Sequence, residues 1–594
     1  MQTITFYSYK GGTGRSLALA NAARYLARLG LKVVALDFDL EAPGLHYKFS
    51  SNPDGMPLPV EAGVVDYLYR FIMDGETSLP IKDFTLNVCV PGADKSCIQL
   101  IPAGKVPSND YWTKLSRMNW HELFYSRDAK GVQVFLELKN RVLDELQPDF
   151  LLVDSRTGIT EMGGVATTLF ADKVICLVSL TRENLEGSRA VLRSLNRSRR
   201  EFGEPNLEIM VALSRLPQMK GSEDERELTD KVRAVMNEEA EDLKDTLSCR
   251  EVFVLHSEAN LQIQEALRVA SGVSPDESIL LRDYLRLFAS FVPGELIEPK
   301  VHDLIQQAKQ KIWEDPQTAV KDMEILAESF GHPEHYRELL RFYLVRNISG
   351  PLILRRAQRL WELTGDTSDP VLWQAVRGGF DPKPRWQREK EWSPDLDFIR
   401  AVWHDAGNND PEFGVKVAEA YDDEDRESTA ADVLLEIIRA FGPTLPVVSR
   451  CIGLLDAAER DKEADTLIQE FKEKLADEPP FIEAWARHAL RRNSKEVLFE
   501  LTQPPFVDNL RRIPPYIAIR VYLGSGMKEE AYASADAVLE EVKERRFSPA
   551  LLGDLGEVFQ ALGRREEFEE VVARRDPEAL REVQRRLRYS LQHK

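Results

Sequence analysis

The stretch YSYKGGTGRSLALAN, from Tyr7 to Asn21, decides the fold of the N-terminal half of this chain. It follows the strand-like TITFYS and opens an amphipathic helical segment, an order of strand, glycine-rich turn and helix that is typical of a phosphate-binding loop. Glycines in such a turn permit positive φ and let backbone N–H groups approach phosphate oxygens, and the helix N-terminus adds its dipole. We therefore predict a phosphate-binding loop rather than a purely structural turn. Its expected nucleotide-binding residues are Gly11, Gly12, Thr13, Gly14, Arg15, Ser16 and Leu17.

Two basic residues, Lys10 and Arg15, occupy a loop that ordinarily needs one. Arg15 stands where a lysine normally reaches the terminal phosphates, and the hydroxyl of Ser16 is placed to coordinate magnesium. A guanidinium makes bidentate phosphate contacts, whereas an ammonium is a compact point charge, so the exchange preserves charge but changes reach. The loop thus predicts phosphate binding. Because the exchange of lysine for arginine changes the reach of the side chain, its effect on catalysis does not follow from the charge alone.

Two further apolar strands end in acidic residues. VVALDFDLEAPGL carries Asp37 and Asp39, and FLLVDSRTG carries Asp154, the residue type needed to hold a magnesium-bound water. Carboxylates at the C-terminal ends of parallel strands face the ligand crevice of an open sheet. The residues that follow Asp154, Arg156 to Gly158, are expected to form a mobile switch segment.

Residues 1–295 are predicted to form an α/β P-loop domain with a mostly parallel sheet and helices on both faces, because short β-branched runs alternate with amphipathic stretches. The predicted strands are TITFYS, KVVALDFD, FLLVDSR, KVICLVS, EIMVALSR and EVFVLH. A helical insertion is expected at about 50–130, with further strand material around CIQLIPAG. The proline- and glycine-containing VPGELIEPKVHD places the domain boundary near residue 295.

Residues 296–594 are predicted to form an all-α solenoid of helical repeats, since strand signals almost disappear and amphipathic helices follow one another. Five phrases open a helix with a small or apolar register residue, at Ala430, Ala464, Val497, Ala531 and Phe568. The gaps of 34, 33, 34 and 37 residues are close to the period of about 34 in tetratricopeptide repeats. Ala319 and Ala357 extend the series upstream. Irregular helical hairpins are the alternative interpretation.

The composition limits the classes of protein. A chain of 594 residues, of which 43% are hydrophobic and 30% charged, is too long for one core and indicates two or more soluble domains. The formal charge of -20 argues against a surface that binds nucleic acid or anionic lipid throughout, because counterion release needs clustered Lys and Arg. No run of about 18 apolar residues and no export signal is present, so a cytoplasmic protein without membrane contact is expected.

The five cysteines are odd in number, lack metal-ligand spacing and occur in apolar contexts, so buried, reduced thiols are expected. They are Cys89, Cys97, Cys176, Cys249 and Cys451.

The motifs KGGTGRS, DFDLEAPGL and VDSRTG, in this order, resemble those of the deviant Walker A ATPases of the ParA/MinD type over roughly residues 1–290. The arginine at position 15 is similar to the branch described as KGGVGR-motif variants. The resemblance implies ATP and Mg²⁺ as cofactors, ATP hydrolysis, and a homodimer in which Lys10 reaches the partner's nucleotide while Arg15 serves its own.

The same resemblance implies roles for the acids. Asp39 would orient the attacking water, Asp37 would support the metal shell, and Asp154 would be the Walker B acid. The expected catalytic residues are therefore Lys10, Asp39 and Asp154, and the expected metal ligands are Ser16, Asp37 and Asp154.

Three positions are less clear in this comparison. Related ATPases often carry Asn after the strand equivalent to IMVALSR, for adenine recognition, whereas this chain has Ser214 and Arg215. VLHSEANLQIQEAL resembles the loop and helix that close over the base, although the usual proline is missing. Glu41 is either a metal-shell residue or an acid at a helix start.

The predicted function is a slow ATPase switch in which ATP favours a closed dimer, hydrolysis releases the switch segments, and the helical repeats bind a protein partner. The variant branch resembles proteins of bacterial conflict and signalling operons, which implies a role in antiviral defence. The alternatives are a nucleotide-stabilised scaffold that scarcely hydrolyses, a DNA-partition ATPase, and membrane positioning. The last would use the basic C-terminal REVQRRLRYSLQHK, for which a solenoid cap or tail is the other interpretation.

Overall fold

The computed structural model contains two compact units, Met1–Phe342 and Tyr343–Lys594. It describes the chain except for residues 50–57, 77–78, 92–96, 126–130, 159–160, 202–203, 220–221, 264, 349, 382–394, 408 and 593–594. Helices α12 (Gly294–Lys311) and α13 (Pro316–Phe330) belong to the first unit. By compactness these two helices group with the sheet. Compactness does not define a domain, so the domain boundary near residue 295 stays a prediction.

The first unit is built on an eight-stranded sheet with the order β3-β4-β2-β5-β1-β6-β7-β8. Every strand runs parallel to its neighbours except β3, which is antiparallel to β4. The strands are β1 Gln2–Tyr7, β2 Val33–Asp37, β3 Leu86–Cys89, β4 Cys97–Ile101, β5 Phe150–Asp154, β6 Lys173–Val178, β7 Glu208–Leu216 and β8 Val252–His256. The predicted α/β class with a mostly parallel sheet is confirmed, and β4 lies in the strand material expected around CIQLIPAG. The short edge strand β3 was not predicted.

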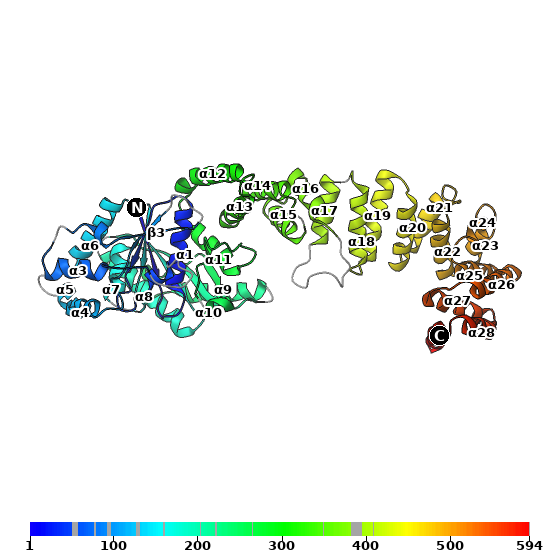
Figure 1. The fold of residues 1–594 in the computed structure, drawn as a ribbon, viewed down its shortest axis with the longest axis horizontal. Coiled ribbons are helices and arrows are strands. Elements are labelled where there is room, and N and C mark those ends of the chain that lie inside the picture. The colour runs from blue at the N-terminus through cyan, green and yellow to red at the C-terminus, as the bar shows by residue number, and fades with distance from the viewer. Residues whose placement is uncertain are drawn as a thin grey trace. The chain divides into compact units, whose positions relative to one another are not determined.

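Helices cover both faces of the sheet (Figure 1), which explains why the central strand β5 is buried along its whole length. On one side α1 contacts β1, β2, β4, β5 and α11, and on the other α3, α6 and a π-helical segment (η3) pack on β2 and β5. The helices of this unit are α1 Arg15–Arg28, α2 Leu45–Lys48, α3 Val64–Met73, α4 Asn109–Arg117, α5 Trp120–Tyr125, α6 Gly131–Arg141, α7 Glu161–Gly164, α8 Arg182–Glu201, α9 Ser222–Met236, α10 Ala259–Ile263, α11 Ile279–Phe291, α12 and α13, with single turns η1 Ile81–Phe84, η2 Val142–Leu146, η3 Val165–Phe170 and η4 Leu243–Asp245.

The second unit is helical throughout its described residues, as predicted. Successive helices pack on their neighbours along the chain. They are α15 Pro351–Thr364, α16 Pro370–Gly379, α17 Leu396–Ala406, α18 Pro411–Asp422, α19 Glu427–Phe441, α20 Leu445–Ala457, α21 Asp461–Phe471, α22 Pro479–Arg491, α23 Lys495–Leu501, α24 Val507–Leu510, α25 Pro515–Ser525, α26 Lys528–Glu544, α27 Pro549–Ala561, α28 Arg565–Arg575 and α29 Pro577–Gln592, while α14 Pro333–Val345 spans the division between the units. The basic C-terminal stretch lies in α29, and its side chains from residue 586 onward are outside the described part.

One turn recurs between helices of the second unit. A residue with positive φ precedes α19, α21, α23, α26 and α28, at Asp425, Glu459, Asn493, Gly526 and Gly563. The amide of the next residue donates to a carbonyl five positions back each time, the pattern of a Schellman helix end. The spacing of these turns repeats the period seen in the sequence.

The register residues follow these turns. Ala430, Ala464, Ala531 and Phe568 are fully buried, but the predicted Val497 is only half-buried. Helix α23 has Ser494 as its N-cap, so the position equivalent to the other four is Leu498, which is 1% exposed. The prediction for Val497 was wrong by one residue, because the polar RRNSKE run contains no apolar residue that would mark the helix start.

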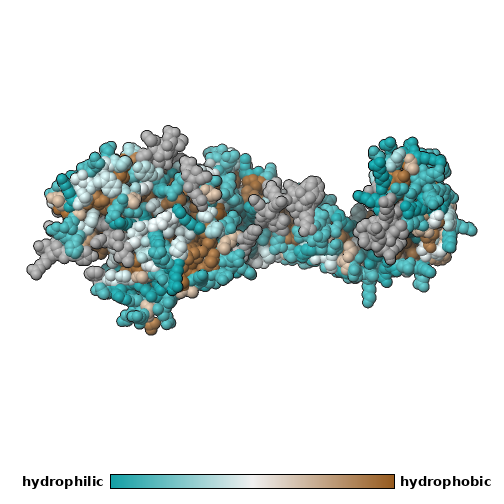
Figure 2. All heavy atoms as spheres, turned by 90° about the horizontal axis from the view of Figure 1, so that it is seen from below, coloured by the Kyte–Doolittle hydropathy of each residue, from teal (hydrophilic) through white to brown (hydrophobic). Residues whose placement is uncertain are grey.

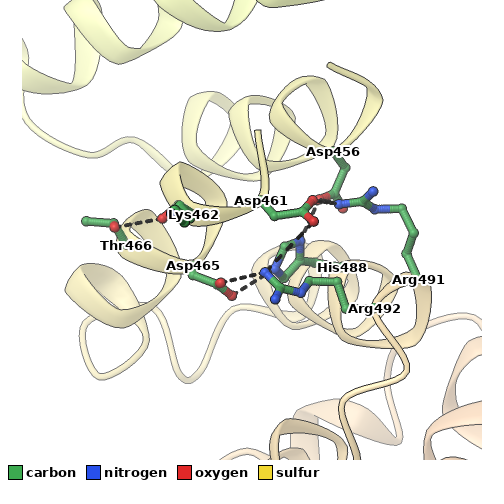
Figure 3. A network of polar contacts seen from close by, with 8 residues as sticks. All are labelled: Asp456, Asp461, Lys462, Asp465, Thr466, His488, Arg491 and Arg492. Atoms are coloured by element: carbon green, nitrogen blue, oxygen red, sulfur yellow. Dashed lines mark hydrogen bonds and ion pairs between the residues drawn. The ribbon is translucent and has the colours of Figure 1, made fainter. Parts of the chain in front are cut away.

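A histidine joins three helices of the second unit (Figure 3). His488 of α22 is 2% exposed, and its two ring nitrogens face Asp456 of α20 and Asp465 of α21, the latter at 3.0 Å. Because carboxylates only accept hydrogen bonds, a protonated ring satisfies both contacts. Arg491 and Asp461 complete the network with a further ion pair.

Hydrophilic residues cover most of the surface seen in Figure 2, which agrees with the strongly charged composition. No helix among the described residues is long and apolar enough to cross a membrane. The cysteine prediction was correct for Cys176, Cys249 and Cys451, which are buried, but wrong for Cys89 and Cys97, which are exposed. The latter two belong to the unpredicted hairpin β3–β4 at the edge of the sheet, where side chains reach solvent.

Candidate functional site

The sheet topology brings the predicted loop and the predicted acids to one edge. Strands β2, β5 and β1 are adjacent, and Asp154 is the register partner of both Phe6 and Asp37. The loop leaves β1 directly after Tyr7, so it emerges beside the carboxyl ends of β5 and β2, where ligands of open parallel sheets bind. Arg15 and Asp154 are thereby neighbours, although 139 positions separate them.

The loop has the backbone conformation of an anion cradle. Gly12 and Gly14 have φ of 79° and 83°, and Gly14 is the N-cap of α1. A Cβ atom on Gly11, Gly12 or Gly14 would meet no protein atom within 4 Å. The glycines at 12 and 14 therefore serve a left-handed backbone, and the space beside the loop is open to a ligand.

The Arg15 side chain is buried between two acids. Its Nε lies 2.6 Å from Asp154 Oδ1 and its Nη2 lies 2.7 Å from Asp39 Oδ2. Desolvation opposes the charge of Arg15, but the two carboxylates outweigh it and the pKa of Arg15 is raised. Arg15 is therefore a fixed cation whose partners are the predicted Walker B acid and the predicted water-orienting acid.

Asp37 is fully buried beside this pair. Its Oδ2 accepts hydrogen bonds from the backbone N–H groups of Gly44, at 3.2 Å, and Leu45, at 3.0 Å. Burial first, and then the charge of Asp154, raises the pKa of Asp37 to about 8. The carboxyl of Asp37 is thus mostly protonated at neutral pH, which relieves its repulsion with Asp154 and Asp39, the two acids that pair with Arg15.

Lys10 lies apart from this cluster and is half-exposed. Its Nζ forms an ion pair with Glu183 of α8. The same helix approaches the loop closely, since a Cβ on Gly187 would come within 2.4 Å of the Tyr9 ring. Glu183 and Gly187 were not predicted as site residues, although a glycine inside the helical TRENLEGSR was a signal of close packing.

The predicted switch segment contacts the loop that follows β2. Arg156 forms an ion pair with Glu41, and Gly158, with φ of 78°, accepts a hydrogen bond from the Tyr7 hydroxyl at 3.2 Å. Glu41 lies in the segment between β2 and α2. The sequence left two interpretations of Glu41 open, a metal-shell residue and an acid at a helix start. Its ion pair with Arg156 is a third interaction, which the sequence did not predict. This pair links the segments that carry Asp39 and Asp154.

The residues that directly follow the region predicted to close over the base are fastened to α1. The side-chain oxygen of Asn21 accepts hydrogen bonds from the backbone of Arg268, at 2.8 Å, and Val269, at 2.9 Å. At the end of β7, the Ser214 hydroxyl donates to the Val178 carbonyl, and Arg215 is exposed with φ of 59° in a bulge of the β7–β8 ladder. Ser214 is therefore engaged within the sheet, whereas Arg215 projects at the ligand edge.

The basic row on α8 is engaged within the protein. Arg189 and Arg193 donate to the carbonyls of Val235 and Glu238, and Arg197 and Arg200 both pair with Asp245. These arginines hold the end of α9 and the turn after it. They therefore do not form a free basic surface for nucleic acid.

The side chains at the edge fit a magnesium-bound nucleotide. The hydroxyl of Ser16, the second residue of α1, and the carboxylate of Asp154 are hard oxygen donors of the kind that Mg²⁺ takes, and Asp37 would join them on losing its proton. Thr13 Oγ1 and Arg15 Nη1 are buried polar atoms for which the described residues supply no hydrogen-bond partner. Such atoms beside an open glycine loop are expected where phosphate oxygens bind.

No family model matches the chain. Among curated proteins, a putative replication protein A of Rhizobium rhizogenes is 26% identical over 168 residues, which is 27% of this chain. The match spans 39% of that relative, so the chain covers about two-fifths of its length.

Similar solved structures cover the N-terminal half of the chain. The septum site-determining protein MinD of Pyrococcus horikoshii, complexed with Mg-ADP, is 18% identical with a TM-score of 0.33, covering 50% of this chain and 98% of that one. A ParA family ATPase from Chlorobium tepidum is 17% identical with a TM-score of 0.30, covering 45% and 88%. A MinC:MinD cell division complex of Aquifex aeolicus is 18% identical with a TM-score of 0.31, covering 49% and 98%.

Proposed function

We propose that this chain is an ATP-binding switch that hydrolyses ATP slowly, works as a homodimer, and engages a protein partner through its helical repeats. The observation that carries the proposal is the contact of Arg15 with both Asp39 and Asp154 beside an open glycine loop. A cation of the loop and the acids of two other strands converge at the one edge where parallel sheets bind ligands.

The residues divide the work by their chemistry. The N–H groups of Gly11 to Leu17 and the Arg15 guanidinium would bind phosphate oxygens, while Ser16, Asp37 and Asp154 would hold the metal. When bound, magnesium supplies charge neutralisation for phosphoryl transfer. Arg15 gives up its carboxylate partners when it turns to phosphate, and this frees Asp39 to accept a hydrogen bond from the attacking water.

Lys10 is the proposed contact across the dimer. Its present partner, Glu183, is 69% exposed in its side chain, and exposed ion pairs contribute little to stability. Lys10 can therefore leave Glu183 and contact the nucleotide of the partner subunit across a small barrier. Two basic loops without nucleotide would repel each other, so the dimer depends on ATP.

The proposed partner site is the helical unit. Its recurring turns and buried register residues support stacked helical hairpins of the tetratricopeptide-like kind, which would bury their apolar faces on one another and leave polar faces for a ligand. From the resemblance to variant-motif proteins we propose a role in bacterial conflict, antiviral defence or signalling, and the site geometry is neutral on that point.

Phosphate release by the full chain tests the enzymatic part. We expect measurable turnover with ATP and Mg²⁺ in the wild type, loss in Asp39→Asn, and no change in Asp230→Asn, whose carboxylate pairs with Arg233 on the surface of α9. Gel filtration with ATP should show a dimer for Asp39→Asn and a monomer for Lys10→Ala. Turnover that survives Asp39→Asn would remove Asp39 from the mechanism.

A nucleotide-stabilised scaffold is the second candidate. The observation that favours it is the ion pair between Asp39 and Arg15, because a carboxylate oxygen that accepts from a guanidinium is not free to orient a water molecule. Equal background phosphate release in wild type and Asp39→Asn, together with retained ATP binding, would establish the scaffold. DNA partition is disfavoured by the engaged arginines of α8 and by the net charge.

A further inference from the structure

Two of the five cysteines face each other at the edge of the sheet. In the antiparallel pair β3–β4, Cys89 is the register partner of Cys97, and the two Sγ atoms are 4.0 Å apart. Both side chains are exposed, whereas Cys176, Cys249 and Cys451 are buried. The pair is remote from every motif that the proposed function uses.

The register pairing of Cys89 and Cys97 is compatible with a disulfide. Residues directly opposite on antiparallel strands have Cα atoms about 4.5 to 5.5 Å apart, and disulfides span about 4.4 to 6.8 Å between Cα atoms. Only rotation of the two side chains is needed to bring the sulfurs to bonding distance. Among the described residues, no other two cysteines have their sulfur atoms in hydrogen-bond contact.

We propose that Cys89 and Cys97 form a reversible modification site that exchanges with low-molecular-weight disulfides to give an intrachain disulfide. One thiolate attacks the small disulfide, which forms a mixed disulfide and releases one small thiol. The second cysteine then attacks the mixed disulfide and releases the other small thiol. Two electrons pass from the cysteine pair to the small disulfide, and the two protons of the cysteines end on the released thiols.

The exposure of this pair suits a reversible bond. Desolvation, and then hydrogen bonding to Cys89, raise the pKa of Cys97. Exposed disulfides belong to the labile and regulatory class rather than to the structural one. The pair is therefore suited to form a disulfide that small thiols reduce again.

The bond would restrain a strand that supports the neighbouring layers. β4 pairs with β2 up to Leu36 and Ile101. The carbonyls of Pro102 and Ala103, just beyond β4, accept the first amides of α3 at 2.9 Å. A Cys89–Cys97 disulfide would therefore restrain the start of β4, the strand that carries these contacts to β2 and α3.

The test equilibrates the full chain in buffers of reduced and oxidised glutathione, alkylates free thiols, and locates the bonds by mass spectrometry. We expect one Cys89–Cys97 bond per chain in the wild type and in the control Cys451→Ser, and a single glutathione on the remaining cysteine in Cys89→Ser and in Cys97→Ser. Amide hydrogen exchange of residues 86–89 and 97–101 should slow several-fold on oxidation in the wild type and in Cys451→Ser, but not in Cys89→Ser or Cys97→Ser.

Three outcomes would overturn the proposal. Glutathione retained on both Cys89 and Cys97 of one chain would show that the second attack fails. A bond between two chains would assign the cysteines to an intermolecular contact. Reduced thiols throughout, in a buffer that oxidises a reference dithiol, would exclude the site.

Discussion

The two units of this protein both place a cation between two carboxylates, but with different cations. In the sheet unit Arg15 lies between Asp39 and Asp154, and in the helical unit His488 lies between Asp456 and Asp465 (Figure 3). Both side chains are nearly excluded from solvent. The guanidinium cannot lose its charge, whereas the imidazole can.

The difference separates a proposed ligand site from a structural contact. Arg15 lies beside an open loop and has a buried Nη1 atom with no partner among the described residues, so its arrangement leaves a donor available to the proposed nucleotide. His488 has both ring nitrogens engaged and neighbouring arginines paired with acids, so its arrangement is complete. The same arrangement of a cation between two carboxylates therefore gives two predictions. In the sheet unit, Arg15 releases its acids when a ligand binds. In the helical unit, the stability depends on pH.

Removing the fixed cation should have the largest effect. Arg15→Met leaves Asp39 and Asp154 without their buried counter-charge, and we expect the free energy of unfolding to fall by about 3 to 5 kcal/mol. Denaturant titration followed by far-UV circular dichroism measures this. In a double-mutant cycle, the double variant Arg15→Met/Asp154→Asn should lose less free energy of unfolding than the two single variants lose in sum. Additive losses would show that the contact is not an energetic unit.

The corrected register of the helical unit should give the next largest effect. Leu498→Ala removes a buried side chain and is expected to cost about 2 to 5 kcal/mol, while Val497→Ala, at a half-buried position, should cost clearly less. Thermal unfolding of both variants checks the order. A larger loss in Val497→Ala would restore the register read from the sequence.

Replacing the titratable cation should have a smaller, pH-dependent effect. Burial alone would lower the pKa of His488, but the hydrogen bonds and charges of Asp456 and Asp465 outweigh it, so the pKa is raised. The stabilisation is therefore complete below the unfolded pKa of about 6.5 and is lost as pH rises through the higher folded value. We expect His488→Gln to cost about 1 to 3 kcal/mol at low pH and progressively less at higher pH.

Thermal unfolding of His488→Gln and wild type across this pH range measures the trend. The matched control is His302→Gln, because His302 is exposed on the surface of α12. A difference from wild type that stays constant with pH would mean that His488 remains in one protonation state.

The smallest effect on stability is expected for Glu183→Gln. The ion pair with Lys10 is exposed, so unfolding should be unchanged within error. Because Lys10 loses its intramolecular partner, the ATP-dependent dimer should form at lower protein concentration, measured by analytical ultracentrifugation. Weaker dimerisation would mean that Glu183 itself contributes to the dimer contact.

The sequence predicted the class of fold because strand and helix periodicities are local properties. It also predicted Arg15, Asp39 and Asp154 as site residues, since each lies at the end of a recognisable strand or loop, and the structure brings the three together. It did not predict that Arg15 contacts both acids, because this depends on the order β2-β5-β1 in the sheet. Glu183 was missed for the same reason, since α8 meets the loop only in three dimensions.

Local signals failed at two other places. The strand β3 is short and carries a polar Asn87 beside the apolar Val88, so no clear alternation marked it. Without that strand, Cys89 and Cys97 could not be recognised as facing residues. At α23 the start of the helix is set by the turn at Asn493, and the apolar pattern alone placed the register one residue early.

The central claim is that Arg15 holds the proposed water-orienting acid, Asp39, and the proposed metal ligand, Asp154, until phosphate takes their place. Its most direct test is the thermal midpoint of wild type and Arg15→Met with Mg²⁺ alone and with Mg²⁺ and ATP together. The account predicts that Mg²⁺ alone leaves the wild type unchanged but stabilises Arg15→Met, and that Mg²⁺ with ATP stabilises the wild type. An equal response of both proteins to Mg²⁺ alone, or no response of the wild type to Mg²⁺ with ATP, would contradict it.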